Sequence, residues 1–185
     1  MADVSGKGVG AALFMTISKT VLKNQLQLGV SPAEALTNAN RQLCEGNDVG
    51  LFVTCWAGVY DTESGVLTFV NAGHNPPVII RKGEKPQFIQ QRSGFVLAGL
   101  ETVKYKQETL QLSVGDEMLF YTDGVTEATN ANNELFGNDR LLKCLADCRK
   151  ETVADQIHAL KEHIDAFVGE AEQFDDITIM ATRIS

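Results

Sequence analysis

The sequence predicts an α+β domain in which helices pack on a mainly antiparallel sheet or pair of sheets. Its length of 185 residues suits one domain with a sizeable core. The spacing of apolar residues changes from a helical period to strand-like alternation near residue 50. The predicted elements follow the order helices, several strands, helices and one strand, which differs from the regular alternation of parallel α/β folds.

Two helices are predicted at the start of the chain. The first covers 9–27, where apolar residues recur every four positions and form one stripe that we expect to face the core. The second begins at Ser31 and Pro32, because serine caps helices and proline fits their first position, and it ends near Gly46. The stripe of the first helix consists of Leu13, Ile17 and Val21.

The middle of the chain predicts strands joined by tight turns. The segment LFVTCWAGVY (51–60) is largely apolar at both alternating positions, which indicates a strand covered on both faces. DTESG (61–65) predicts a hairpin turn, after which VLTFVNA (66–72) returns as the partner strand. Shorter strands follow between Gly, Pro and Asp turns: PPVIIR (76–81), PQFIQ (86–90), YKQETLQL (105–112) and EMLFYTD (117–123).

Two more helices and a last strand complete the predicted order. One helix covers 138–150 and the other covers 152–169, where apolar residues are spaced three and four apart. The segment DDITIMATRI (175–184) predicts the final strand.

Charge and composition exclude several classes of partner. The net charge of −8 disfavours nucleic acid and anionic membranes, because both repel an acidic surface. No apolar run approaches the roughly 18 residues that a membrane span requires, and the chain opens without a leader segment. We therefore expect a cytoplasmic protein that contacts neither nucleic acid nor membrane.

The chain has four cysteines, none of them in a CxxC pair. Cys144 and Cys148 are four residues apart and would share one face of a helix. A zinc site would need two further ligands, and the chain has only three histidines to offer. We therefore predict that these two cysteines are buried free thiols.

Three places in the chain carry the acidic residues of greatest chemical interest. Asp3 precedes the Gly-rich turn SGKGVG, Asp123 ends a predicted strand, and Asp175 and Asp176 open the last strand. Aspartate is common at strand ends as a turn former, so a turn by itself explains each of them. If the carboxylates meet, oxygen ligands without histidine or cysteine favour a hard cation, Mg²⁺ or Mn²⁺.

Other motifs do not fit the Gly-rich turn or the acidic segments. A P-loop requires glycine and serine or threonine at the positions that Met1 and Gly8 occupy. An EF-hand loop placed at 123–134 fails at its third and sixth positions. Ser5 has neither of the spacings that surround nucleophilic serines.

Four stretches resemble the metal-dependent serine/threonine protein phosphatases of the type 2C superfamily, in particular the bacterial SpoIIE-like branch that regulates sigma factors. They occur in the family's order and spacing and extend over nearly the whole chain. NAGHNPP (71–77) is typical of the branch, and we expect His74 to have a structural role in its turn. The four stretches are DVSGKGVGAALFM (3–15), FVTCWAGVYDTESGVLTFVNAGHNPPVII (52–80), VGDEMLFYTDGVTEATNANNELFG (114–137) and FDDITIMATRI (174–184).

The resemblance implies a fold of two antiparallel sheets packed face to face as a sandwich, with helices on the outside. It also implies two Mn²⁺ or Mg²⁺ ions at one end of the sandwich, which activate a water molecule for attack on phosphoserine or phosphothreonine. Two cations would lower the pKa of that water and offset charge on the phosphoryl oxygens. No covalent phosphoenzyme is required, so the protein mostly positions the reactants and screens their charge.

The resemblance also assigns candidate metal ligands. Carried over by position, Asp3 resembles the aspartate that bridges both metals, and the backbone carbonyl of Val4 resembles a ligand of the second metal. Asp123 and Asp175 resemble the other carboxylate ligands of the first metal. The water held by the metals, rather than a side chain, would be the nucleophile.

Asp176 and Gly124 adjoin these ligands and are expected to support them, Asp176 by orienting a water or the loop. The family domain normally begins well before DVSGKG, with strands that supply a further acidic ligand for the second metal. Those strands are absent, so we expect a truncated single domain (1–185), the C-terminal part of a longer multidomain protein, with weak metal binding and impaired turnover. Unpaired sheet edges would favour strand exchange or a homodimer.

Three functional hypotheses follow. The leading one is a phosphatase acting on a small phosphoserine protein, such as an anti-sigma-factor antagonist, under the control of an upstream sensor or receiver domain. The second is a non-catalytic module that docks a phosphoprotein, which the missing acidic ligand favours. The third is a metal-dependent hydrolase of small phosphate esters. The retained Asp3, Asp123 and Asp175 favour an enzyme, because a degenerate site would have no metal to hold.

Overall fold

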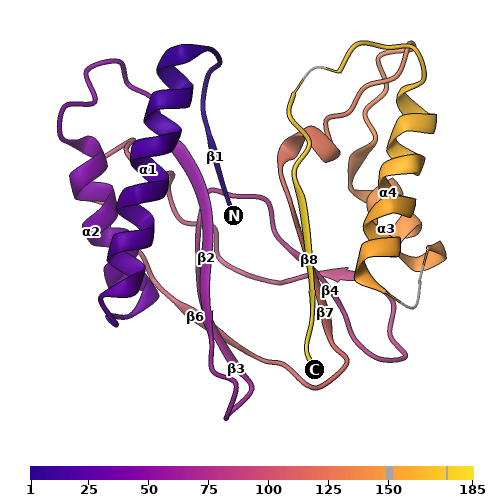
Figure 1. Cartoon of the computed structure of the whole chain (residues 1–185), viewed down its shortest axis with the longest axis horizontal. Coiled ribbons are helices and arrows are strands. Elements are labelled where there is room, and N and C mark those ends of the chain that lie inside the picture. Colours follow the sequence, from indigo (N-terminus) through magenta and orange to yellow (C-terminus); the bar gives the residue numbers. More distant parts are fainter. Residues whose placement is uncertain (149–151, 174) are drawn as a thin grey trace. The chain divides into compact units, whose positions relative to one another are not determined.

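A computed structural model describes residues 1–148, 152–173 and 175–185, and the chain divides into two compact units. Unit 1 comprises Met1–His74 and Gln91–Leu112, and unit 2 comprises Asn75–Gln90 and Ser113–Ser185. Within the described residues, each unit contains one four-stranded antiparallel sheet and two α-helices (Figure 1). The predicted α+β class with two antiparallel sheets is confirmed.

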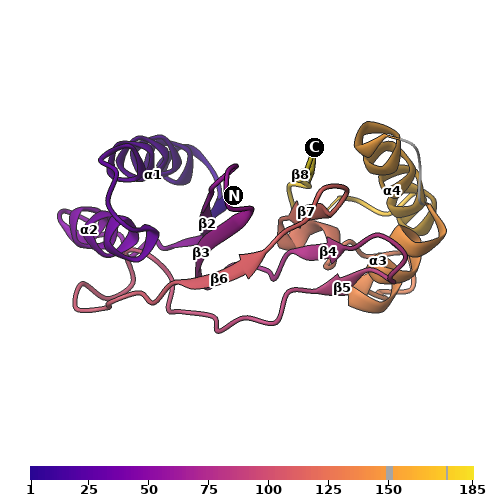
Figure 2. The ribbon, with the colours of Figure 1, turned by 90° about the horizontal axis from the view of Figure 1, so that it is seen from below.

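The elements of unit 1 are β1 (Ala2–Val4), α1 (Val9–Gln27), α2 (Pro32–Cys44), β2 (Val53–Tyr60), β3 (Val66–Ala72) and β6 (Glu108–Gln111). The strand order is β1-β2-β3-β6, and each neighbouring pair is antiparallel. Helix α2 packs on β2 and β3, and α1 packs on α2 and β1 (Figure 2). Both predicted helices and the β2–β3 hairpin are confirmed. Because β1 is an edge strand, self-association through it stays a prediction.

The core of unit 1 lies between α2 and the first half of β2. Val53 and Cys55 are buried in the apolar cluster of this unit. On the opposite face of β2, Trp56 stacks on Phe69 of β3 with ring centroids 5.0 Å apart. Strand β2 is thus covered on both faces over its first half, as predicted, whereas Val59 is 50% exposed.

Helix α1 buries only the end of the predicted stripe. Leu13 and Ile17 are 62% and 53% exposed, whereas Ser18 and Leu22 are buried. Val21 is partly buried and packs against the core of unit 1. Each step of four residues turns the side chain about 40° further around a helix, so a strict four-residue spacing drifts away from any one face. The contacts of α1 with α2 and β1 decide which face is covered. The spacing of apolar residues along the sequence carries no information about these contacts.

Polar groups fix helix α2 at its start and in its middle. The Ser31 side chain accepts a hydrogen bond from the backbone N–H of Glu34 at 3.3 Å, which confirms the predicted cap. Asn40 is fully buried; it accepts from the N–H of Ala98 at 2.8 Å and donates to the carbonyl of Leu100 at 3.0 Å. This side chain therefore satisfies two backbone groups and holds their loop against the helix.

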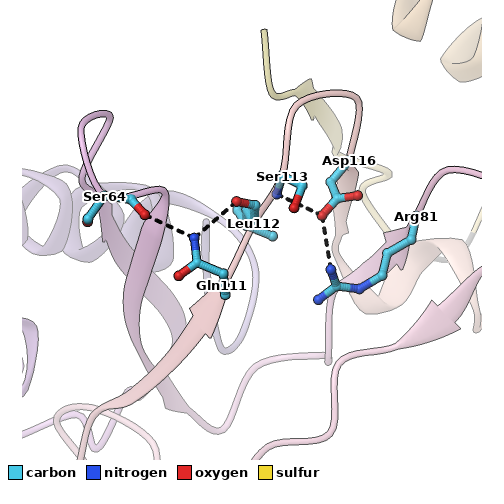
Figure 3. Close-up of polar contacts among 6 residues, drawn as sticks. All are labelled: Ser64, Arg81, Gln111, Leu112, Ser113 and Asp116. Atoms are coloured by element: carbon cyan, nitrogen blue, oxygen red, sulfur yellow. Dashed lines mark hydrogen bonds and ion pairs between the residues drawn. The ribbon is translucent and has the colours of Figure 1, made fainter.

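The β2–β3 hairpin closes on the predicted DTESG turn. The N–H of Asp61 donates to the carbonyl of Val66 at 2.9 Å. The Asp61 carboxylate accepts hydrogen bonds from the Ser64 hydroxyl and the Glu63 N–H, which lower its pKa. Gln111 of β6 donates its side-chain amide to the carbonyl of Ser64 at 2.9 Å and so joins the turn to the next strand (Figure 3).

The elements of unit 2 are β4 (Val78–Ile80), β5 (Gln87–Phe88), β7 (Glu117–Tyr121), the 3₁₀ turn η1 (Asp123–Val125), α3 (Gly137–Asp147), α4 (Val153–Val168) and β8 (Ile179–Arg183). The strand order is β5-β4-β7-β8, all antiparallel. Of the predicted helix 138–150, residues 149–150 lie outside the described residues. The prediction of a strand over 175–184 is wrong at its start, because β8 begins only at Ile179.

Helices α3 and α4 pack on each other and α4 packs on β8, which builds the core of unit 2. Leu141 and Leu145 of α3 and Leu160 and Ile164 of α4 are fully buried there. Cys144 lies in the same cluster, and burial, followed by the hydrogen bond with Cys148, raises its pKa to about 12. Cys144 and Cys148 are buried and form no disulfide, as predicted. Among the described helices, none is long and apolar enough to cross a membrane.

Asp116 joins the β6–β7 connection to strand β4 in unit 2. Its carboxylate Oδ2 accepts a hydrogen bond from the N–H of Ser113 at 3.0 Å (Figure 3). The same oxygen forms an ion pair with the Arg81 guanidinium at 3.2 Å. The Asp116 side chain is 5% exposed and that of Arg81 is 30% exposed. The arginine and the backbone donor therefore compensate a nearly buried carboxylate.

We expect Asp116→Ala to lower the free energy of unfolding of unit 2 by about 2–3 kcal/mol, because it removes the acceptor of the Ser113 N–H and an ion-pair partner of Arg81. Chemical denaturation followed by circular dichroism measures this change. The matched control is Lys161→Ala in the exposed Lys161–Asp165 pair of α4, for which a change within about 0.5 kcal/mol is expected. Equal effects of the two substitutions would contradict the stabilising role of Asp116.

Candidate metal centre

Asp3 and Val4 lie in the short strand β1 of unit 1. In the antiparallel pairing with β2, Asp3 faces Thr54 and Val4 faces Val53. The pairing continues beyond the strand, because Ser5 donates its N–H to the carbonyl of Phe52 at 2.9 Å and its hydroxyl accepts the Phe52 N–H at 2.8 Å. The Ser5 hydroxyl is thus a structural acceptor, consistent with the lack of support for it as a nucleophile.

The Gly-rich turn leads from β1 into α1 through two residues with positive φ. Gly6 has a φ of 80° and Gly8 has a φ of 86°, which other residues adopt only with strain. Helix α1 then begins at Val9 without a side-chain cap. The glycines therefore serve the sharp change of direction that keeps Asp3 in the strand and the helix beside it.

His74 closes the turn after β3 in the same unit. Its N–H donates to the side-chain oxygen of Asn71 at 2.7 Å, and the Asn71 amide donates to the carbonyl of His74 at 2.8 Å. The ring Nδ1 lies 2.9 Å from the Thr54 hydroxyl. His74 is 5% exposed, and these contacts agree with the structural role expected for it. Thr54, which sequence analysis missed, is the residue opposite Asp3 and therefore links this turn to strand β2 beside Asp3.

Asp123 is the first residue of η1, directly after β7 in unit 2. Its backbone carbonyl accepts hydrogen bonds from the N–H of Glu127 at 2.8 Å and from the Thr126 hydroxyl at 3.2 Å. Its side-chain Oδ1 is buried and has no hydrogen-bond partner among the described residues. A buried carboxylate oxygen without a partner is costly unless a ligand satisfies it.

The segment that carries Asp175 and Asp176 is bound tightly to the end of β7. Thr122 accepts the N–H of Thr178 on its hydroxyl at 3.0 Å and donates that hydroxyl to the carbonyl of Asp176 at 3.0 Å. A Cβ added at Gly124 would lie 2.3 Å from the same carbonyl oxygen. Only glycine allows this approach, which places the Asp175–Asp176 segment against the residue that follows Asp123.

Asp175 and Asp176 have different surroundings. The Asp175 carboxylate accepts the N–H of Asp176 at 2.9 Å, and the carbonyl of Asp175 accepts the side-chain amide of Gln173 at 2.8 Å. Asp176 is exposed, and its backbone carbonyl is the group that contacts Thr122. The supporting role of Asp176 stays a prediction, and Thr122 is a second residue of this segment that sequence analysis missed.

A small pocket of about 40 Å³ adjoins this segment within unit 2. Gly124 and Asp175 line it, and Glu127, Asp165 and Glu172 add further acidic groups. Nearby, burial raises the pKa of Tyr121 to about 12, against a smaller lowering effect of its hydrogen bond with Asn75. The environment of the Asp123–Asp175 pair is therefore rich in carboxylates, with a neutral phenol two residues from Asp123.

The predicted ligands thus belong to both units: Asp3 and Val4 to unit 1, Asp123 and Asp175 to unit 2. The donor atoms are carboxylate and carbonyl oxygens, which suit a hard divalent cation such as Mg²⁺ or Mn²⁺. The buried Oδ1 of Asp123 fits such an ion, because a cation would satisfy an atom that has no hydrogen-bond donor.

Comparison with protein families matches residues 1–185 to the family described as Stage II sporulation protein E (SpoIIE). Among curated proteins, phosphoserine phosphatase RsbU of Bacillus subtilis is 31% identical over 135 residues, which is 73% of this chain and 40% of the relative. Phosphoserine phosphatase RsbP of the same organism is 26% identical over 168 residues, or 87% of this chain and 41% of the relative. The chain spans about two fifths of the length of each.

Solved structures with the same fold include the SiaA-PP2C domain of Pseudomonas aeruginosa, with a TM-score of 0.84 and 21% identity over 100% of this chain and 73% of that one. A second is the catalytic domain of the serine/threonine protein phosphatase PstP in complex with two manganese ions. Its TM-score is 0.71 at 17% identity, covering 100% of this chain and 86% of that one. At these sequence identities, the structural similarity establishes a shared fold and nothing about activity.

Proposed function

The chain belongs to the SpoIIE family, and we propose that it is a metal-dependent phosphatase domain that hydrolyses phosphoserine or phosphothreonine on a protein. The observation that carries this proposal is the arrangement around Asp123, whose buried Oδ1 has no hydrogen-bond partner among the described residues. The close approach at Gly124 holds the Asp175 segment beside it. An acidic pair arranged in this way suits a divalent cation.

The proposed ligands are the carboxylates of Asp3, Asp123 and Asp175 and the backbone carbonyl of Val4. Each carboxylate lies in a segment whose backbone is fixed: Asp3 by the pairing of β1 with β2, Asp123 by η1, and Asp175 by the contacts of its neighbour Asp176. Such support limits the reorganisation that metal binding would require. We propose Mn²⁺ or Mg²⁺ as the cofactor, with two ions in a domain that has all its ligands.

Bound Mn²⁺ or Mg²⁺ would supply Lewis acidity toward a water molecule and toward the phosphoryl oxygens of the substrate. The chain's own residues would position these groups. Thr122 and Gly124 hold the Asp175 segment at a fixed place beside Asp123, and Ser5 holds Asp3 in register with β2. None of these residues needs to act as a nucleophile, since their polar atoms are used in structural hydrogen bonds.

We propose that the substrate is a small phosphoserine protein, such as an anti-sigma-factor antagonist, and that a sensor or receiver domain of the same protein controls the activity. Two relatives named phosphoserine phosphatases support the substrate class. The net charge of −8 disfavours a nucleic-acid or membrane partner. We place the domain in the cytoplasm, where such regulatory proteins act.

Hydrolysis of a phosphoserine peptide and of p-nitrophenyl phosphate, each with and without Mn²⁺, tests the proposed function. We expect Mn²⁺-dependent release of phosphate from the peptide. The rate should be low in the 185-residue chain and higher in a form extended upstream by the strands that the family resemblance implies, because those strands would add the further acidic ligand.

Other outcomes of this assay favour the other hypotheses. If the extended form binds Mn²⁺ and hydrolyses neither substrate, even with added phosphoprotein, the non-catalytic docking module takes the place of the enzyme. If p-nitrophenyl phosphate is hydrolysed far faster than every phosphopeptide, a hydrolase of small phosphate esters is favoured. If the extended form binds no metal, the assignment of Asp3, Asp123 and Asp175 as ligands is wrong.

A further inference from the structure

A second group of metal-ligating side chains lies in unit 2, formed by Cys144, Cys148 and His163. Cys144 belongs to α3, Cys148 follows its last turn, and His163 comes from α4. The two sulfur atoms are 3.7 Å apart, and the Cys148 sulfur lies 3.9 Å from Nε2 of His163. One ligand atom from each residue lies within 4.8 Å of the others.

We propose that Cys144, Cys148 and His163 form a binding site for Zn²⁺ that joins α3 to α4. This site is separate from the carboxylate centre of the proposed phosphatase activity and does not depend on that activity. Its sulfur and imidazole ligands select a thiophilic divalent cation, whereas the aspartate centre selects a hard one.

The spacing of the three ligand atoms agrees with tetrahedral zinc. With Zn–S bonds of about 2.3 Å and a tetrahedral angle, two coordinating sulfurs lie about 3.8 Å apart, and a sulfur and an imidazole nitrogen lie about 3.6 Å apart. The observed separations of 3.7 Å between the sulfurs and 3.9 Å between sulfur and Nε2 are close to these values. The Cys148 sulfur is also 3.7 Å from Nδ1, so the exposed ring of His163 must turn for Nε2 to face the ion.

The hydrogen bond of His163 determines which ring nitrogen can bind a metal. Its Nδ1 lies 2.8 Å from the carbonyl oxygen of Ala159, one turn earlier in α4. A carbonyl can only accept, so Nδ1 carries the proton and donates it, which leaves the lone pair on Nε2. Hydrogen bonding of one ring nitrogen to a carbonyl is the usual way in which a ligating histidine is oriented.

Charge and burial favour a divalent ion at this position. Cys144 and Cys148 are each 5% exposed and belong to the apolar core of unit 2. Two thiolates, one neutral imidazole and Zn²⁺ have no net charge, so the desolvation penalty for placing the ion there is reduced. His163 is exposed, which leaves a route of entry and a fourth coordination position for water.

Titration of the reduced protein with Co²⁺, a spectroscopic substitute for Zn²⁺, tests the proposal. We expect a sulfur-to-cobalt charge-transfer band in the near ultraviolet that saturates at one equivalent and disappears when Zn²⁺ is added. Cys148→Ser should remove much of the band, and His163→Gln should weaken binding by at least about tenfold. Since His163 is exposed, its substitution leaves the core intact and the result interpretable.

Two controls separate this site from other metal-binding groups. Cys44→Ser changes a cysteine of unit 1 outside the cluster and should leave the band unchanged. Asp123→Asn alters the carboxylate centre and should also leave the band unchanged, so failure of either site is recognised independently. The proposal is overturned if no charge-transfer band forms, or if the band keeps its affinity in both Cys148→Ser and His163→Gln.

Thermal unfolding gives a second readout that needs no cobalt. With free Zn²⁺ at a hundredfold excess over its Kd, we expect the Tm of the protein to rise by roughly 5–10 °C. The same excess should leave the Tm of His163→Gln nearly unchanged. A rise of equal size in both proteins would show that the stabilisation comes from zinc bound elsewhere and would contradict the cluster as the site.

Discussion

Asparagine in place of Asp123 is expected to abolish Mn²⁺-dependent turnover and to weaken Mn²⁺ binding by at least about tenfold, the lower end of what loss of an outer-shell partner costs. The substitution keeps the shape of the side chain and removes its charge. Oδ1 of Asp123 is buried without a hydrogen-bond partner among the described residues, so its charge is available for a cation. Of the proposed ligands, it therefore makes the clearest test.

Loss of the free Mn²⁺ signal in electron paramagnetic resonance measures the affinity of each variant, and phosphate release from a phosphoserine peptide measures turnover. Asp48→Asn is the matched control, because Asp48 is an exposed aspartate in the connection between α2 and β2. It should bind Mn²⁺ as the unmodified chain does. If Asp123→Asn binds Mn²⁺ with unchanged affinity, Asp123 is not a ligand.

Gly124→Ala is expected to weaken Mn²⁺ binding nearly as much as Asp123→Asn, although it replaces no proposed ligand. The added Cβ would lie 2.3 Å from the carbonyl oxygen of Asp176, a contact that backbone atoms must move to relieve. That movement would shift the Asp175 segment away from Asp123 and break the hydrogen bonds of Thr122. We expect a loss of about 1–3 kcal/mol in the free energy of unfolding and a drop of at least about tenfold in Mn²⁺ affinity.

Gly10→Ala is the matched control for this substitution. A Cβ at Gly10 meets nothing within 4 Å, and the residue lies in helix α1, where alanine is favoured over glycine. We expect this variant to keep its Mn²⁺ affinity and to be as stable as the original or slightly more so. Gly124→Ala with unchanged affinity and stability would show that the close approach at Asp176 does not hold the centre together.

Those parts of the fold that depend on local chemistry could be predicted from the sequence. Ser31 and Pro32 set the start of α2, and the DTESG turn sets the β2–β3 hairpin, because caps and turns involve residues only a few positions apart. The stripe of α1 could not be predicted, since its buried face is chosen by contacts with α2 and β1. As a result, Leu13 and Ile17 of the predicted stripe are exposed.

In the candidate metal centre, too, some residues could be predicted from the sequence and others could not. Asp123 and Asp175 could be recognised from their motifs, but Thr122 gave no signal of its own, because its partners Asp176 and Thr178 lie more than fifty positions away. His163 was missed as a partner of Cys148 for a related reason, since the pairing depends on how α3 packs on α4. Contacts between distant segments are set by packing, which a single sequence does not display.

The central claim is that the carboxylates of Asp3, Asp123 and Asp175 are ligands of divalent cations. The most direct test is a crystal structure of the chain grown with Mn²⁺, with anomalous diffraction recorded at the manganese edge. The account predicts an anomalous peak in contact with the carboxylates of Asp123 and Asp175. Clear density for these side chains with no peak beside them, or manganese bound only at other carboxylates, would contradict it.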